Sequence, residues 1–216
     1  MPKPSEFYIG VMEFFSILLP GSLLVAAVVG RWHPELHPPL VALITSRTAG
    51  WIGFALAAYA AGHFLFLLAS LLDSPVYDRY RRWRWPVAED HCYPFAVEAR
   101  KAYFRGDHGP DVPMNTFAWA KAVLRMEAPA ASADVERYEA DSKFFRSLVI
   151  AIPVSGAILL PTLPGLIALT VLLTALAFVA YADRRHKSTE WAYRYAVVLA
   201  ASKLPPPVPG RRLPGA

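Results

Sequence analysis

The sequence predicts an all-α integral membrane protein: four transmembrane helices, a cytosolic helical insert between helices 2 and 3, and a cytosolic C-terminal helix. Three observations lead to this fold class. Of the 216 residues 55% are hydrophobic, and the mean hydropathy is +0.31, which is uncommon for a soluble domain. Long apolar stretches match a bilayer core of roughly 30 Å. Arg-rich polar segments separate them, and the single cysteine, Cys92, excludes an intramolecular disulfide.

The first predicted span is Phe7–Gly30, which carries one charged residue, Glu13. Pro20-Gly21 in its middle predicts a kink, because a proline removes one backbone hydrogen bond and clashes with the preceding turn. The second span, residues 49–72, has His63 as its one titratable group. The two spans bracket a short outer loop and form the predicted unit 1–72.

Small residues recur at four-residue spacing in both spans, a pattern that allows two helix backbones to approach closely. These predicted helix-packing residues are Ser22, Ala26, Gly30, Gly53, Ala57 and Ala61.

Glu13 and His63 are predicted to lie at a similar depth. Counted from the inner boundary, Glu13 is about 9 Å deep and His63 about 13 Å. Charged groups inside a membrane are costly and are usually paired or functional. We therefore treat the two as a candidate intramembrane polar pair; the alternative is that Glu13 reaches the inner interface and His63 is a neutral, hydrogen-bonded residue.

The longest apolar stretch, Ser147–Ala182, has 36 residues without Asp, Glu, Lys, Arg or His. One helix of that length would measure about 54 Å, so it must turn back. Pro161 and Pro164, followed by Gly165, predict the turn at 161–165. The arms would be about 21 Å and 27 Å long, and the shorter one must include Phe144 and Phe145 or thin the bilayer locally.

The polar insert, residues 73–146, has 12 basic and 12 acidic residues. It opens with Asp73-Ser74-Pro75, read as a helix cap followed by proline at the first helical position. Four arginines and aromatic residues then alternate. This pattern suits nucleic acid, but its position just after a span favours anchoring to anionic headgroups. With two later arginines, the predicted lipid-headgroup anchor is Arg79, Arg81, Arg82, Trp83, Arg84, Trp85, Arg184 and Arg185.

Three further helices are predicted from the middle of the insert onward. One covers Pro94–Arg105, a second is capped by Asn115 and runs to about Glu127, and a third is capped by Ser132 and continues into the first hairpin arm. The third carries a seam at alternating spacings of three and four, opposed by an amphipathic helix within residues 183–204. The cytosolic seam comprises Val135, Tyr138, Ser142, Phe145, Trp191, Tyr195 and Val198. The Pro-rich tail, residues 205–216, is predicted to be extended or disordered.

Three clusters of acidic residues, histidine or cysteine are candidate metal sites: His33/Glu35/His37, Asp90/His91/Cys92 and Asp107/His108/Asp111. None has a recognisable ligand spacing, and ordinary loops explain them better. We therefore predict no metal and no cofactor.

Basic residues predict the orientation. The insert carries 12 and the segment from Asp183 carries 7, whereas the loop at residues 31–48 has only Arg31 and Arg47. The insert and both termini are therefore expected in the cytoplasm, in a bacterial inner membrane.

No phosphate-binding glycine loop, nucleophile elbow, His-Glu-x-x-His or Cys-x-x-Cys motif occurs in the sequence. We expect a non-enzymatic, homo-oligomeric membrane protein, channel-like or membrane-disrupting, that is gated through its cytosolic helices and contacts anionic inner-leaflet lipids. The alternative is a membrane-anchored interaction or scaffold subunit that binds a soluble protein through residues 73–146. A lipid-modifying membrane enzyme is the third hypothesis; a nucleic-acid partner is not expected.

Overall fold

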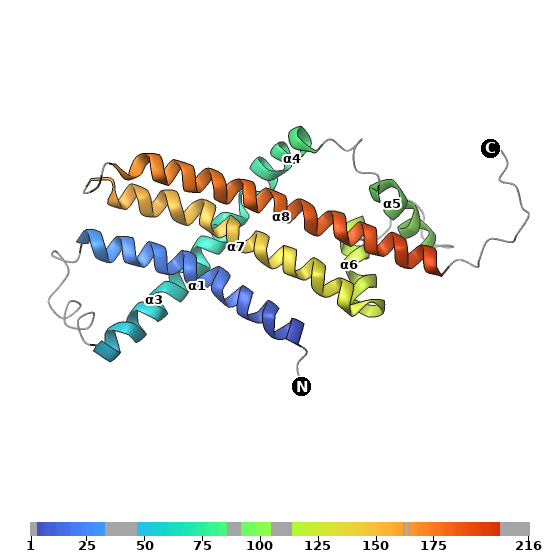
Figure 1. The fold of residues 1–216 in the computed structure, drawn as a ribbon, viewed down its shortest axis with the longest axis horizontal. Helices are drawn as coiled ribbons and strands as arrows, with labels where there is room; N and C mark the ends of the chain where they lie inside the picture. The colour runs from blue at the N-terminus through green and yellow to red at the C-terminus, as the bar shows by residue number, and fades with distance from the viewer. Residues whose placement is uncertain are drawn as a thin grey trace, which may run out of the picture. The chain divides into compact units, whose positions relative to one another are not determined.

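In a computed structural model the chain is all-helical, and no strand occurs among the residues that the structure describes, namely 4–32, 47–85, 92–104, 114–161, 163 and 165–203 (Figure 1). Side chains are described from residue 14 in the first of these ranges and, except for Ser74, from residue 50 in the second. The helices are α1 (Pro4–Trp32), α3 (Arg47–Ser70), η2 (Asp73–Tyr77), α4 (Asp78–Arg84), α5 (Cys92–Tyr103), α6 (Thr116–Glu127), α7 (Pro129–Leu159) and α8 (Leu166–Ser202).

Four helices in the described part of the chain, α1, α3, α7 and α8, are long and apolar enough to cross a membrane. In each of these helices, between 17% and 33% of the most apolar 18-residue stretch is buried inside the chain. Large side chains such as Trp51, Leu56 and Phe64 are therefore mostly exposed, at 73%, 65% and 69%. These helices bury little of their apolar surface against one another.

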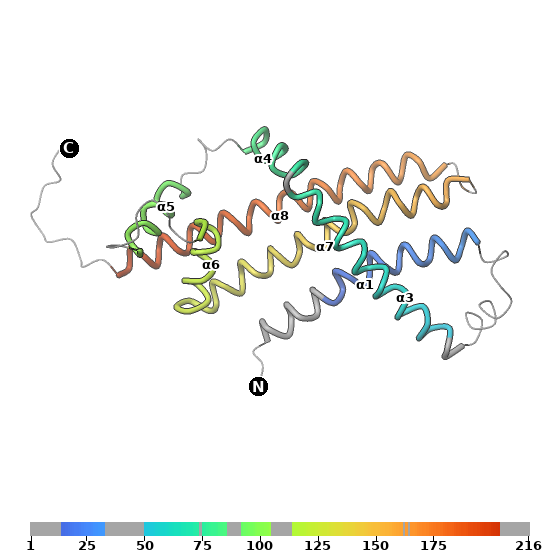
Figure 2. Tube along the Cα trace, turned by 180° about the vertical axis from the view of Figure 1, so that it is seen from behind, coloured from blue at the N-terminus to red at the C-terminus, as the bar shows by residue number. Residues whose placement is uncertain are grey.

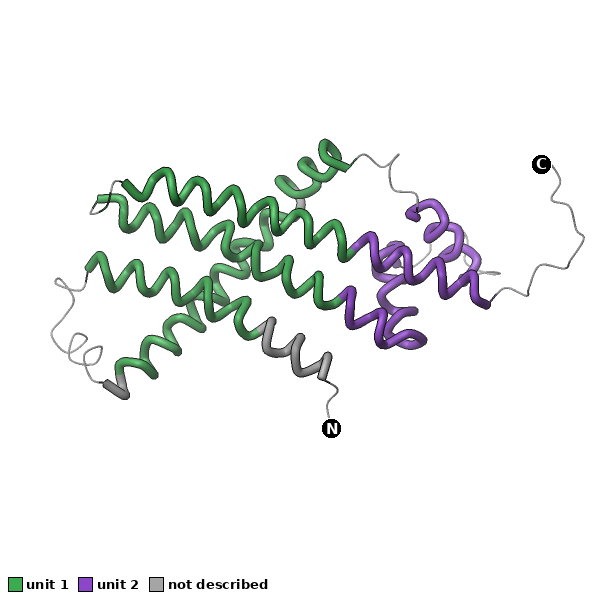
Figure 3. The backbone as a smooth tube through the Cα atoms, viewed as in Figure 1, with its two compact units in different colours: residues 1–87, 136–188 green, residues 88–135, 189–216 purple. Residues whose placement is uncertain are grey.

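The chain divides into two compact units, coloured in Figure 3. Unit 1 comprises residues 1–87 and 136–188, and unit 2 comprises residues 88–135 and 189–216. The predicted insert, residues 73–146, therefore contributes to both units, as do the long helices α7 and α8.

Within unit 1, α1 and α3 cross, as the ribbon and the tube from behind both show (Figures 1 and 2), and the contact between them involves glycines of both helices. A Cβ on Gly62 would lie 2.8 Å from the carbonyl carbon of Ile17, and a Cβ on Gly21 would lie 2.6 Å from the backbone nitrogen of Gly62. Real Cβ atoms do not come so close to backbone. Only glycine allows this approach, and Ala58, which is fully buried, completes the contact.

The predicted packing stripes lie beside this crossing rather than in it. Ala26, Gly30 and Ala57 are exposed, and Ser22, Gly53 and Ala61 are half-buried. The α1–α3 contact uses Gly21 and Gly62 because the two helices cross there, and a glycine allows two backbones to touch directly. Pro20 is buried, and α1 continues through it as helix.

After α3 the backbone makes a π-helical turn, η2. The amide of Tyr77 donates to the carbonyl of Leu72 (3.1 Å), five residues back. Pro75 explains this turn, because a proline has no N–H to continue the four-residue pattern. The helix then resumes as α4.

The apolar parts of α7 and α8 lie side by side in unit 1 (Figures 1 and 2). Gly156 of α7 faces Thr170 of α8, and a Cβ on this glycine would lie 2.6 Å from the threonine side chain. α7 ends at Leu159 and α8 begins at Leu166, so the reversal falls at the predicted prolines. Pro161 is exposed; Pro164 lies outside the described residues. Pro153 lies inside α7, which continues through it as helix.

Unit 2 has its own hydrophobic core. Its buried members come from α5, α6, the first residues of α7 and the last part of α8: Ala96, Trp119, Ala120, Val123, Leu124, Val135, Ala192, Tyr193 and Ala196. The prediction of an Asn115 cap is confirmed, because its side-chain oxygen accepts from the amide of Ala118 (2.8 Å).

The predicted cap at Ser132 is wrong. α7 begins at Pro129, and Ser132 lies within its first turns, buried, with its amide donating to the carbonyl of Ala128 (3.0 Å). Proline at the first helical position starts this helix, since its missing N–H has no partner to lose there.

The seam residues have mixed environments. Val135 is in the core of unit 2, Ser142 is buried, and the Tyr195 hydroxyl donates to Asp134 (3.1 Å). Val198 is 67% exposed, and Trp191 packs only at the edge of the core. The buried face of α8 in unit 2 instead carries Ala192, Tyr193 and Ala196, because alanines let neighbouring helices come closer than Trp191 or Val198 would.

Candidate functional site

Unit 1 contains an ion pair that joins three helical segments. Nη1 of Arg146, on α7, lies 2.5 Å from Oδ2 of Asp73, at the start of η2. The hydroxyl of Tyr181, on α8, donates to the other carboxylate oxygen of Asp73. The Arg146 side chain is 10% exposed and that of Asp73 is 35% exposed. One carboxylate therefore links the end of α3 to both arms of the hairpin.

Aromatic rings enclose this ion pair. The Arg146 guanidinium lies 5.0 Å from the ring centroid of Phe66, and the rings of Tyr77 and Tyr181 are 5.6 Å apart. Tyr77, Tyr181 and Ala182 form the buried cluster of unit 1. Burial raises the pKa of Tyr77 from its ordinary 10.0 to about 12, although the Arg81 and Arg185 cations oppose this shift.

The sequence reading assigned Asp73 to a helix cap, and that prediction is wrong. No side chain among the described residues caps η2, and the Asp73 carboxylate is engaged by Arg146 and Tyr181 instead. A paired cation outcompetes a backbone amide because hydrogen bonds between charged groups are stronger than those to neutral ones.

A signal for this pair was present in the sequence. Asp73 is the first charged residue after the second apolar stretch, and Arg146 is the last before the third. Two opposite charges at the same predicted membrane boundary are well placed to meet, but the number of residues between them gives no indication of contact.

The predicted headgroup anchor lies mainly on α4. Arg79, Arg82, Arg84 and Trp83 are exposed, the tryptophan at 77%, whereas Arg81, Arg184 and Arg185 are half-buried. Trp85 is packed differently: its ring is stacked on His186 of α8, with centroids 4.3 Å apart and an interplanar angle of 9°. Tyr80 contacts Phe178 at 5.1 Å, so α4 is held against α8 by aromatic side chains.

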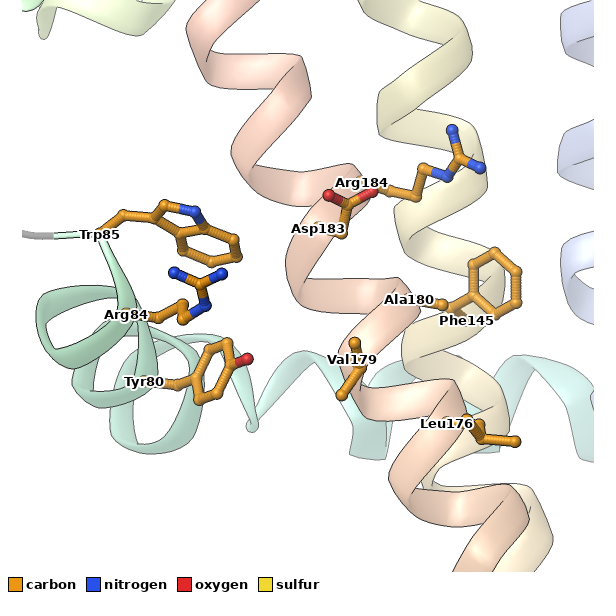
Figure 4. A pocket seen from close by; sticks show the side chains of 9 residues that line it. All are labelled: Tyr80, Arg84, Trp85, Phe145, Leu176, Val179, Ala180, Asp183 and Arg184. Atoms are coloured by element: carbon orange, nitrogen blue, oxygen red, sulfur yellow. The ribbon is translucent and has the colours of Figure 1, made fainter. Parts of the chain in front are cut away.

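A cavity of about 360 Å³ lies between α4, α7 and α8 (Figure 4). Its lining combines apolar, aromatic and charged side chains: Tyr80, Arg84, Trp85, Phe145, Leu176, Val179, Ala180, Asp183 and Arg184. Four of these residues belong to the predicted anchor or seam. A site of this size and mixed polarity is suited to an amphiphilic molecule.

The Glu13–His63 pair stays a prediction. The side chain of Glu13 lies outside the described residues. His63 is exposed on α3, and its ring makes an edge contact with Tyr59 at 4.5 Å.

The three clusters weighed as metal sites fall outside the described residues, apart from Cys92, which is half-buried with a free thiol. Within the ranges that the structure describes, no group of three His, Cys, Asp or Glu side chains is arranged to hold a metal ion.

The ion pair of Asp73 and Arg146 holds helices together, and the cavity between α4, α7 and α8 is suited to binding a molecule. No protein-family model, no curated protein and no solved structure matches the chain. The proposals below therefore rest on this chain's own residues.

Proposed function

We propose that the protein is an integral membrane protein whose spans are α1, α3 and the apolar parts of α7 and α8. The observation that supports this most directly is the exposure of large apolar side chains along α1, α3 and α8, among them Leu19, Phe64 and Leu176. In water such a surface would aggregate, whereas lipid chains solvate it without cost.

The distribution of basic residues supports a cytoplasmic location for the termini and residues 73–146, with a bacterial inner membrane as the site. Labelling with a membrane-impermeant thiol reagent in intact cells tests this. In a Cys92→Ser background, a Leu36→Cys variant should react from outside. Native Cys92 should be protected until the membrane is permeabilised; immediate reaction of Cys92 would reverse the orientation.

Within the membrane we propose an oligomeric, channel-like or membrane-disrupting effector that is gated through its cytosolic helices. The supporting observation is that α7 and α8 are single helices of 31 and 37 residues. They are about 46 Å and 56 Å long, which exceeds the bilayer core of roughly 30 Å. Each contributes residues to both units, so a molecule bound to unit 2 acts on the same helices that would cross the membrane.

Ion and dye release from liposomes containing the purified protein is the direct test. We expect release that grows faster than linearly with the amount of protein per vesicle, because an assembly of several copies is needed. No release at any protein density or membrane potential would contradict the effector proposal.

The predicted small-residue stripe provides a sharp variant for this assay. Ala57 is exposed, so an Ala57→Leu change does not disturb packing inside one chain. It should nevertheless weaken assembly and release if Ala57 packs between copies. Leu67→Ala is the matched control, at a residue of the same helix that is 62% exposed. Equal effects of both variants would mean that the small-residue stripe does not lie at the contact between copies.

The separate core of unit 2 favours a second candidate, a membrane-anchored interaction subunit that binds a soluble protein. Under this proposal the spans only hold unit 2 at the membrane. The full-length protein in nanodiscs should then capture a defined soluble protein and release no ions from liposomes. Ion release without such a partner would favour the effector.

A further inference from the structure

The cavity in unit 1 has two chemically different sides. Leu176, Val179 and Ala180 of α8, with Phe145 of α7, supply an apolar wall. The other wall is aromatic and cationic, and comes from Tyr80 and Arg84 of α4 and from Trp85, which directly follows α4 (Figure 4). All of these residues belong to unit 1.

Arg84 supplies the unneutralised charge on the cationic side. In Figure 4 its side chain lies between those of Trp85 and Tyr80 and extends toward α8. Its guanidinium carbon is 5.7 Å from the Trp85 ring centroid. Among the described residues no carboxylate forms an ion pair with it, so its N–H groups are available to an anion.

Of the other charged side chains that line the cavity, Asp183 is paired and Arg184 extends away from α4 (Figure 4). Asp183 is paired with Lys187, at 3.0 Å between carboxylate oxygen and ammonium nitrogen. The Arg184 guanidinium lies over the ring of Tyr138 on α7, 5.9 Å from its centroid. The exposed Arg79 and Arg82 on α4 add positive potential nearby. An anion is therefore favoured at Arg84.

An exposed apolar track continues from the cavity along α8. Val179, Leu176, Leu172 and Leu169 follow at spacings of three, four and three residues, which puts them on one helix face. They are 53%, 56%, 56% and 49% exposed. A soluble phosphate ester has no group to place on this track, whereas an acyl chain does.

We propose that the cavity binds one anionic phospholipid, with its phosphate on Arg84, its glycerol region against Tyr80 and Trp85, and an acyl chain along the α8 track. This site deepens the proposed membrane function and rests on it, because α4 must lie at the headgroup level. A guanidinium donates two N–H groups to a phosphate in a planar fork, which gives a specific contact rather than a diffuse attraction.

The test measures lipid binding by the full-length protein in neutral detergent, separately from ion release. Phosphatidylglycerol with brominated acyl chains should quench the fluorescence of Trp85, taken as the difference between wild type and Trp85→Phe. Brominated phosphatidylcholine should quench it only at concentrations about tenfold higher. Excess inorganic phosphate should leave quenching unchanged; displacement by phosphate would assign the cavity to a soluble phosphate ester and overturn the lipid proposal.

Two pairs of variants separate a specific site from surface attraction. Arg84→Gln should raise the phosphatidylglycerol concentration for half-quenching about tenfold, as expected for loss of one charged hydrogen-bonded contact. Arg82→Gln removes a positive charge from the same helix outside the cavity. It should change the phosphatidylglycerol concentration for half-quenching by less than about twofold. Val179→Phe should block quenching by filling the cavity, whereas Val171→Phe, at an exposed α8 residue outside it, should not.

Equal weakening by Arg84→Gln and Arg82→Gln would show surface attraction and overturn the proposal. So would unchanged binding in Val179→Phe. If lipid binding follows the expected pattern and liposomes release nothing, the site stands and the effector proposal fails.

Discussion

Asp73 and Arg146 are 73 residues apart in the sequence, and their side chains form an ion pair with 2.5 Å between Oδ2 and Nη1. Because Arg146 is nearly buried, removing either partner leaves charge poorly solvated. We expect Asp73→Asn and Arg146→Gln each to destabilise the protein by about 2 kcal/mol, measured by thermal unfolding in detergent. The double variant should cost less than the sum, since each single change already breaks the pair.

Lys143→Gln is the control for this cycle. Lys143 is on the same helix and pairs with Glu139 at 3.8 Å within α7. Such a contact contributes little, so the change should stay within about 0.5 kcal/mol. Additive effects of the Asp73 and Arg146 substitutions would mean that the pair does not act as a unit.

The glycine crossing of α1 and α3 predicts that one added methyl group strongly affects the stability of the protein. Gly62→Ala should destabilise the protein by about 1–3 kcal/mol, because the new Cβ meets backbone atoms of Ile17 that have no room to move. Gly30→Ala, on α1, adds a methyl group with no described atom within 4 Å. It should be neutral or stabilising by up to about 1 kcal/mol, because alanine favours helix. A loss of stability in Gly30→Ala as large as in Gly62→Ala would contradict the crossing.

The raised pKa of Tyr77 predicts a loss of stability at high pH. Between pH 10 and about 12 the unfolded chain ionises this hydroxyl while the folded chain keeps it neutral. The stabilisation is therefore complete below pH 10 and is lost as the pH rises through about 12, with an upper limit of about 3 kcal/mol. Unfolding of wild type and Tyr77→Phe across this range measures it.

The Tyr77→Phe variant should have a flatter pH dependence than wild type. Replacing Tyr103, which is 52% exposed, by Phe should leave the wild-type pH dependence in place. If the two variants had the same pH dependence of stability, burial of the Tyr77 hydroxyl would not be the cause of the loss of stability at high pH.

The predicted pair of Glu13 and His63 is tested by a double-mutant cycle on ion release or assembly. If the groups are paired, Glu13→Gln and His63→Ala should each impair the measured activity, and the double variant should cost much less than their sum. Additive effects would show that His63 acts without Glu13. That outcome would fit the exposed position of His63 and its edge contact with Tyr59.

How much of the fold was predictable depends on the range of the interactions involved. The four apolar helices, the reversal near Pro161 and the Asn115 cap follow from contiguous residues. Bilayer-length apolar runs and proline chemistry act locally, so they can be read along the chain. The start of α7 at Pro129 is equally local, but two neighbouring signals compete there, and the proline at the first helical position prevails over Ser132 as a cap.

The helix partners were decided by tertiary structure. The spacing of small residues identified two stripes, but the helices meet at Gly21 and Gly62 because backbone contact depends on where two helices cross. The charge pattern puts Asp73 and Arg146 at the same predicted membrane boundary, but only the structure shows that they pair and that Tyr181 donates to the same carboxylate. A sequence by itself determines which residues are charged and which segments are apolar. Which opposite charges pair, and which side chains enclose a cavity, depends on distances between segments that no local pattern records.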